Sequence, residues 1–496
     1  MKQKVCVIGA GFSGLVSAGV LAKEGFEVSL YEKNLFLGGR ASSMNIEGFH
    51  FDKGPSWYWM PEVYDQAFHR MGVKRSDYYS LTRLDPGFRV YFDKLDYVDI
   101  PDDYNELRDL FENMESGGAV ALDRFMKEAR EKYTLGVNGM ARMPSVSWME
   151  FLSPALWKSA MKMDLFSSVA DHVQKRFKNE RIRKIMEFPV LFLGASASRI
   201  PALYTMMNYA GMCLGTYYPS GGFAGVVKGF EDVVKDLGVE IYAGTAVTGF
   251  ETNRDSVTRI VLEGKQGVET DFVVGSADYA HIDTLLASKK RNYKSDYWKK
   301  KVFAPSALLY YVGINKKMED IEHHNLFFHA PFDKHIDTIY SHPSWPDDPL
   351  FYVCCPSKTD EGVAPVGHEN LFFLIPIATG LEDSEEIREH YFSMIISRFE
   401  EVTGENIKEH IVVKKSYGLD DFKQEYNAYG GNAYGLANTL RQTAVLKPSI
   451  RHRKLHNLFY AGQLTVPGPG VPPALISGEI VADYIIKNYQ LKNGAL

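Results

Sequence analysis

The chain opens with KVCVIGAGFSGLVSAGVLAKEGFEVSLYEK, residues 4–33, and this stretch decides the fold. It reads as a short apolar strand, a glycine-rich turn, a helix, a second strand and an acid, which is the order of a dinucleotide-binding βαβ unit. Gly9 permits the tight turn, Gly11 lets the backbone approach a pyrophosphate, and Gly14 lets the helix pack close to the strand. The sequence therefore predicts a nucleotide site at this turn.

The residues around the turn complete this prediction. Phe12 and Ser13 begin the helix, whose unpaired N–H groups and dipole favour the pyrophosphate. Glu32 ends the second strand, 18 residues past Gly14 (32 − 14), near the spacing of about 20 that the fingerprint requires. We expect Glu32, with Lys33 beside it, to lie at the adenosine ribose. A βα turn without a ligand is the alternative; a signal peptide is not, because no small-residue cleavage site follows.

Composition sets the broad class. The chain has 496 residues, 45% hydrophobic and 24% charged. This length is too great for one simple core and should divide into two or three parts. The net charge of −6 argues against a general nucleic-acid partner.

Cysteine and histidine spacing gives no metal signature. The four cysteines contain no CxxC pair, which makes a disulfide framework or a cysteine metal site improbable and fits a reducing cytoplasm. His323, His324 and His329 lie close in sequence without HExxH spacing. Ordinary strand or loop histidines are the expected interpretation.

Two further motifs follow the second strand: LGGRA at 37–41 and GFHFDKGPS at 48–56. With the N-terminal fingerprint, they resemble the FAD-dependent amine oxidase and carotenoid desaturase superfamily. The resemblance implies that FAD is the cofactor, and that its flavin side lies near Gly39, Arg40, Gly54 and Pro55. A polar turn with a solvated arginine is the alternative for GGR.

A second part of the site is expected in the middle of the chain. YPSGG at 218–222 leads into a helix with one apolar face. Strand-like runs follow at 239–242, 246–250, 257–262 and 272–275. This arrangement resembles the segment in which the chain of this family returns to the FAD-binding domain. The resemblance implies that the backbone at Val247 meets the adenine.

The third part is C-terminal, with YAGQLT at 460–465 and VPGPGVPP at 466–473 before a closing helix. A proline in the first helical turn leaves N–H groups free to hydrogen-bond the flavin pyrimidine. The resemblance assigns to the cofactor Gly462, Gln463, Gly470, Val471 and Pro472. Many family members carry Gly-Asp where this chain has Gly-Gln; an amide can still donate or accept there.

Four motifs narrow the resemblance to bacterial-type phytoene desaturases: FDKGPSWYWMP, FPVLFLG, YNAYGGNAYGLANTL and the VPGPGVPPALISG ending. The resemblance implies an α/β fold with a Rossmann-like FAD-binding domain of the glutathione-reductase-like type over 1–85, 220–285 and 425–496. A mixed α+β substrate-binding domain would take 86–130 and 286–424. A helical, membrane-facing lid would take 131–219.

One uncharged run bears on the membrane. Residues 200–227, 28 in number (227 − 200 + 1), contain no Asp, Glu, Lys, Arg or His. Pro201, Pro219 and clustered glycines argue against a transmembrane helix, because their backbone groups would go unsatisfied in lipid. A basic cluster at 175–184 beside this run favours docking on a membrane surface. The alternative is a solvated helix face followed by buried core.

The resemblance also implies a reaction. A hydrophobic C40 carotenoid would lose a hydride to flavin N5 and then a proton. The cation left behind is delocalised along the polyene, so no strong base is needed, and positioning and water exclusion remain as the protein's task. We assign no catalytic residue; Asn432, Tyr434 and Asn438 are candidate polar groups near the flavin, each with a structural role as the alternative.

The remaining expectations concern partners and competing functions. Quinone or oxygen would reoxidise the flavin. The protein is expected to be cytoplasmic and peripherally bound to the inner face of the cell membrane. The alternatives are a later-acting carotenoid desaturase, a carotenoid isomerase or carrier of the same fold, and an amine or porphyrinogen oxidase. The uncharged run and the aromatic FDKGPSWYW motif argue against the oxidase.

Overall fold

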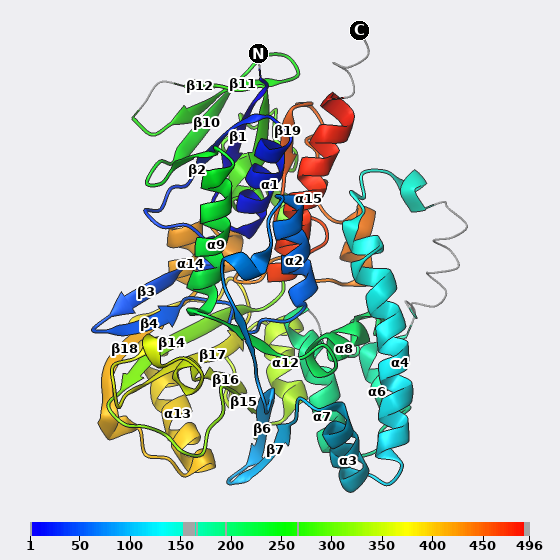
Figure 1. Cartoon of the computed structure of the whole chain (residues 1–496), viewed down its shortest axis with the longest axis vertical. Helices are drawn as coiled ribbons and strands as arrows, with labels where there is room; N and C mark the ends of the chain where they lie inside the picture. Colours follow the sequence, from blue (N-terminus) through cyan, green and yellow to red (C-terminus); the bar gives the residue numbers. More distant parts are fainter. Residues whose placement is uncertain (1, 152–163, 165–166, 194–195, 265–266, 491–496) are drawn as a thin grey trace.

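The computed structural model describes residues 2–151, 164, 167–193, 196–264 and 267–490 (Figure 1). Within these residues the strands form a five-stranded parallel sheet, a seven-stranded mixed sheet and three smaller sheets. The parallel sheet and its helices make one half of the molecule, and the mixed sheet makes the other.

The parallel sheet draws strands from the start, middle and end of the chain. Its spatial order is β19 (Leu458–Tyr460), β13 (Phe272–Gly275), β1 (Lys4–Ile8), β2 (Glu27–Tyr31) and β9 (Glu240–Tyr242). Val7 lies between Val274 and Leu30 on the neighbouring strands, and all three are buried, as expected where a parallel sheet is covered on both faces. The predicted α/β fold with a Rossmann-like sheet is confirmed.

Helices cover one face of this sheet. They are α1 (Phe12–Lys23), α9 (Gly222–Asp236) and α15 (Val471–Ile485), with α2 (Pro61–Arg70) against α15. Figure 1 shows the red α15 beside the dark blue α1. The two helices pack closely because position 478 is glycine: a Cβ there would lie 2.6 Å from the backbone oxygen of Ser13.

A small antiparallel sheet lies against the opposite face. It contains β10 (Val247–Thr252), β11 (Val257–Leu262) and β12 (Val268–Glu269). Ile260 of this sheet shares a buried core with Ile8 and Val273 of the parallel sheet. Short helices α10 (Tyr279–Thr284) and α11 (Ser295–Lys299) complete this side.

The mixed sheet has one parallel pair, β15 with β6, and antiparallel neighbours elsewhere in the described chain. Its order is β18 (Ile411–Tyr417), β14 (Ser306–Ile314), β17 (Glu369–Ile377), β16 (Phe351–Cys354), β15 (His324–Phe327), β6 (Phe88–Asp93) and β7 (Asp96–Ile100). On one face, Phe373 packs against Phe399 of α13 (Glu385–Thr403). The other face carries Leu309, Tyr352 and Leu374.

Smaller elements connect the halves. They are the hairpin β3 (Ser43–Ile46) and β4 (Phe49–Asp52), the pair β5 (Leu81–Arg83) and β8 (Tyr217–Pro219), α12 (Phe332–Tyr340) and α14 (Leu419–Tyr426). Phe51 of β4 meets Tyr311 of β14 edge to face, with ring centroids 5.7 Å apart. The hairpin therefore packs directly on the mixed sheet.

A helical region flanks the mixed sheet. It contains α3 (Tyr104–Met114), α4 (Gly118–Val137), α6 (Val169–Gln174), α7 (Glu180–Glu187) and α8 (Met206–Met212). Much of the predicted membrane-facing lid belongs here, but 152–163, 165–166 and 194–195 lie outside the described residues. Among the described residues, no helix combines the length and the apolar character needed to cross a bilayer.

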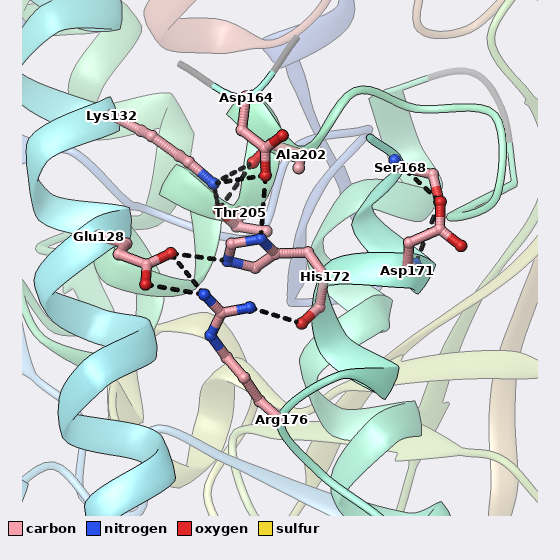
Figure 2. A network of polar contacts seen from close by, with 9 residues as sticks. All are labelled: Glu128, Lys132, Asp164, Ser168, Asp171, His172, Arg176, Ala202 and Thr205. Atoms are coloured by element: carbon pink, nitrogen blue, oxygen red, sulfur yellow. Dashed lines mark hydrogen bonds and ion pairs between the residues drawn. The ribbon is translucent and has the colours of Figure 1, made fainter. Parts of the chain in front are cut away.

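A polar network around the buried side chains of Lys132 and His172 joins α4 to α6 (Figure 2). Lys132 Nζ donates to the backbone oxygen of Ala202 at 3.1 Å and lies 4.0 Å from Asp164. His172 faces Asp164 on one side and Glu128 on the other. Burial lowers the pKa of Lys132 to about 8 and that of His172 to about 4. The network therefore holds a desolvated lysine inside the helical region.

The segments behind the membrane prediction have other partners as well. Arg176 pairs with Glu128 at 2.7 Å, and Arg181 pairs with Asp96. Most of the uncharged run is buried, and it forms α8, β8 and the start of α9. These contacts agree with the alternative given for this segment, a solvated helix face followed by buried core. They do not test membrane association itself.

Candidate functional site

A cavity of about 580 Å³ lies where the three motif-bearing parts of the chain meet. Gly11 and Arg40 come from the first part, Val247 and Asp278 from the middle, and Gly462 from the end. The volume is within the range of about 300–1,000 Å³ that holds cofactors and drug-sized ligands. One cavity thus collects the motifs that the sequence assigned to one nucleotide.

The glycine turn is shaped to admit a ligand. Gly11 faces open space, because a Cβ at this position would meet nothing within 4 Å. Gly9 has φ +99° and its Cβ would lie 2.7 Å from the Ala277 nitrogen, so a larger residue is excluded there. Gly14 has a different role: its Cβ would lie 2.0 Å from the Gly9 oxygen, and it keeps α1 close to the turn.

Glu32 is held by the backbone at the end of β2. Its two carboxylate oxygens accept hydrogen bonds from the N–H groups of Ala10 at 2.8 Å and Asn34 at 3.0 Å. Burial raises the pKa of Glu32, and these N–H groups oppose the shift. A carboxylate has about four acceptor positions, so Glu32 can still accept from ribose hydroxyls.

Arg40 lies in a polar cluster at the other end of the cavity. Its Nη2 donates to the backbone oxygen of Asn432 at 3.0 Å, while its buried Nε has no partner among the described residues. When the Gln463 amide is oriented with its oxygen toward Arg40, that oxygen accepts a hydrogen bond from Arg40 Nη2 at 3.0 Å. Burial raises the pKa of Asp278 and nearby Arg40 opposes this. The orphaned Nε is a donor available to a ligand.

Two helix N-termini open on the cavity. The N-caps of α1 and α15 are Gly11 and Gly470, and neither has a side-chain cap. The first-turn N–H groups of α1 are therefore free for an anion. In α15, Pro472 and Pro473 have no N–H, so Val471 supplies the N–H of the first turn that can donate to a carbonyl oxygen. Val471 lines the cavity at the start of α15, whereas Pro472 does not.

Most predicted site residues come together around this cavity. Those that line it are Gly9, Gly11, Phe12, Ser13, Glu32, Lys33, Gly39, Arg40, Gly54, Pro55, Val247, Gly462, Gln463, Gly470 and Val471. Gly14 and Pro472 do not line it. The sequence analysis did not assign His281, Tyr426 and Asn427 to the site, although they also line it. Tyr426 and Asn427 begin the YNAYGGNAYGLANTL motif, whereas no motif contains His281. Of the three candidate polar groups, Tyr434 lines the cavity, while Asn432 and Asn438 do not.

A second, smaller cavity of about 40 Å³ adjoins the first. It is enclosed by apolar side chains that include Leu326, Phe328 and Ile336. Leu374 lines both cavities, and Tyr352 lies directly opposite Leu374 on the neighbouring strand. Leu374 therefore borders both cavities, and the second, mainly apolar cavity lies next to the first along one face of the mixed sheet.

The structure also groups His323, His324 and Cys354, whose ligand-type atoms lie within 4.8 Å of one another. Spacing alone could not show this, because Cys354 comes from the strand beside the histidines. Each histidine has a hydrogen-bond partner: His323 Nδ1 lies 2.7 Å from Thr359 Oγ1, and His324 Nδ1 lies 2.6 Å from Tyr352 Oη. Burial lowers the pKa of both imidazoles.

Comparison with known proteins agrees with this geometry. Residues 12–486 match the family model described as flavin containing amine oxidoreductase. The chain is 39% identical to a carotenoid 3,4-desaturase of Haloarcula japonica, over 98% of each chain. It is 28% identical to a zeta-carotene-forming phytoene desaturase of Myxococcus xanthus, over 98% of this chain and 94% of the relative. An oxidoreductase structure from Methanosarcina mazei superposes with a TM-score of 0.64 at 16% identity, covering 97% of this chain and 100% of that one.

Proposed function

The chain belongs to the flavin containing amine oxidoreductase family and is an FAD-dependent oxidoreductase that acts on CH–CH bonds, and we propose that it introduces double bonds into a C40 carotenoid. The substrate assignment rests on full-length relatives that are carotenoid desaturases. The structural observation that carries it is the apolar cavity that meets the cofactor cavity at Leu374.

The residues of the larger cavity fit FAD. The open backbone at Gly11 and the uncapped start of α1 suit the pyrophosphate. Glu32 has acceptor positions for the adenosine ribose, and the backbone at Val247 would meet the adenine. Arg40 would offer its unpartnered Nε, and Gln463 its amide, to the flavin half.

The surroundings fit a polyene better than a polar substrate. Ala307, Leu309 and Leu374 of the mixed sheet face the cofactor cavity, and the path beyond them is apolar. Amine substrates carry a charge, and a charge is costly to bury without a partner. The apolar path thus supports a carotenoid over the amine or porphyrinogen alternative.

FAD, when bound, supplies a hydride acceptor at flavin N5. The protein would hold one CH–CH bond of the carotenoid against the flavin and keep water away from the resulting cation. Leu309 and Leu374 would supply this apolar contact. The delocalised cation loses its neighbouring proton to a weak acceptor, so a strong base is unnecessary.

The relatives support two substrate classes. A 3,4-desaturase acts late, on a chain that is already conjugated, whereas a phytoene desaturase acts on a colourless precursor. We favour a late-pathway carotenoid as the substrate, because the relative that is 39% identical to this chain is a carotenoid 3,4-desaturase. Expression in bacteria that accumulate phytoene or a later acyclic carotene tests this. New, red-shifted absorption only in the second strain supports a late substrate, and colour in the first supports phytoene.

Membrane attachment and reoxidation belong to the same proposal. A C40 carotenoid is stored in a bilayer, so we propose that the protein collects it at the inner face of the cell membrane. Quinone or oxygen would reoxidise the flavin. Flotation of purified protein with liposomes, and oxygen uptake with and without added quinone, test these two points.

A further inference from the structure

Three hydrogen-bonding side chains form a chain beside the apolar path. Tyr352 Oη lies 2.6 Å from His324 Nδ1 and 2.9 Å from Ser56 Oγ. Both Tyr352 and His324 are buried, with exposed fractions of 2% and 0%. Such polar groups are costly inside an apolar core unless they are paired.

The chain of contacts also lies close to the cofactor cavity. Ser56 directly follows Pro55, which lines that cavity. Tyr352 lines the second cavity and lies opposite Leu374, which lines both. A carotenoid that entered the second cavity past Leu374 would therefore lie beside the Tyr352 side chain.

The histidine is fixed in one orientation. Trp57 stacks on the His324 ring with centroids 4.1 Å apart and planes at 10°. His324 Nε2 has no hydrogen-bond partner among the described residues. With its proton on Nε2, the imidazole accepts the Tyr352 O–H at Nδ1, and Ser56 donates to the Tyr352 oxygen.

From this arrangement we propose that Tyr352 and His324 relay the proton that leaves the carotenoid during desaturation, a role that rests on the proposed function. The C–H bond breaks and its electron pair completes the new C=C bond of the cation. The proton goes to Tyr352 Oη while the Tyr352 proton goes to His324 Nδ1. The imidazolium later returns the proton through Tyr352 and Ser56 to solvent.

The chemistry suits a weak base. Burial holds the pKa of His324 well below its ordinary value, so the imidazole is neutral at pH 7. It can take a proton only from a strong acid, and a polyene cation is one. Its weakness also lets the imidazolium release the proton again before the next turnover.

The test compares adjacent buried histidines. His324→Asn keeps an acceptor for the Tyr352 hydroxyl but cannot hold a proton, and Tyr352→Phe removes one oxygen. His323→Asn is the matched control, because His323 is 5% exposed and bonds Thr359 instead of Tyr352. Each FAD-loaded protein would be given a carotene in liposomes, and product formation would be followed by polyene absorption. The isotope effect would be measured with a carotene that carries deuterium at the carbon that loses the proton.

We expect His324→Asn and Tyr352→Phe to slow product formation by about 100-fold or more, in the range of general acid–base catalysis, with an increased isotope effect at that carbon. His323→Asn should resemble wild type, and all variants should retain FAD. Equal rates and isotope effects for His324→Asn and His323→Asn would overturn the relay. A wild-type protein that converts no carotene would instead overturn the proposed function, and the relay with it.

Discussion

The carboxylate of Asp52 accepts a hydrogen bond from the backbone N–H of Phe223, 2.6 Å away. Asp52 also accepts from Ala224 at 3.1 Å, so one side chain from the FDKGP motif caps the N-terminus of α9. Gly222 makes room for it: it has φ +67°, and a Cβ there would lie 2.3 Å from Asp52 Oδ2. This contact ties the first part of the cofactor site to the middle part.

Removing this cap should destabilise the fold. For Asp52→Ala we expect a loss of about 2 kcal/mol in the free energy of unfolding, because two N–H groups at a helix N-terminus lose their side-chain acceptor. Urea unfolding of the FAD-loaded protein measures it. Asp232→Ala is the control, since Asp232 makes an exposed i,i+4 pair with Lys228, which contributes little. Equal losses in both variants would refute the capping role.

Arg40→Met should weaken FAD binding. It removes a buried guanidinium whose Nε is available to the cofactor, and a charge-assisted hydrogen bond to a ligand contributes about 1.5–3 kcal/mol. We expect the Kd for FAD to rise by at least about tenfold. Titration of apoprotein by flavin fluorescence measures it, with the exposed Arg254→Met as control. An unchanged Kd would show that Arg40 serves the protein scaffold alone.

Leu374→Phe should separate substrate binding from cofactor binding. The larger ring would narrow the junction of the two cavities, so carotenoid conversion should fall while FAD content stays constant. Ile375→Phe is the control, because it enlarges the next residue, which faces α13 on the opposite side of the sheet. Overpacking should cost both variants a similar amount of stability, about 1–3 kcal/mol. If both variants lose conversion equally, the path does not pass Leu374.

Lys132 predicts a pH dependence of stability. Burial lowers its pKa to about 8, so between about pH 8 and 10.5 the folded protein binds fewer protons at this site than the unfolded chain. The site's contribution to the free energy of unfolding therefore rises with pH in this window, by about 3 kcal/mol in total. The free energy of unfolding, measured for wild type and for Lys132→Met at each pH, should differ by an amount that rises across this window. The exposed Lys127→Met on the same helix is the matched control for loss of a lysine.

The sequence was most informative where local geometry restricts the residue type. The turn at Gly9, Gly11 and Gly14 and the acid at Glu32 could be placed from spacing alone, because each has a fixed position in one βαβ unit. Gly14 and Pro472 illustrate the limit: the motifs contain them, but neither lines the cavity. Gly14 instead packs against the backbone of Gly9.

The remaining site depends on contacts between distant strands. Tyr352 and His324 meet because β15 and β16 pair, and no spacing rule predicts which strands of a mixed sheet become neighbours. Asp52 was expected only as part of a flavin-side motif, and its partner lies 171 residues away. Such pairings follow from the tertiary fold, so one sequence does not reveal them.

The central claim is that hydride loss from a carotenoid reduces the bound flavin. Anaerobic mixing of FAD-loaded protein with liposomes that carry an acyclic carotene tests it, with flavin and polyene absorption followed together. We expect one flavin to be reduced for each double bond formed, in the same kinetic phase. A polyene that changes while the flavin stays oxidised, or a flavin reduced by an amine but not by any carotene, would contradict it.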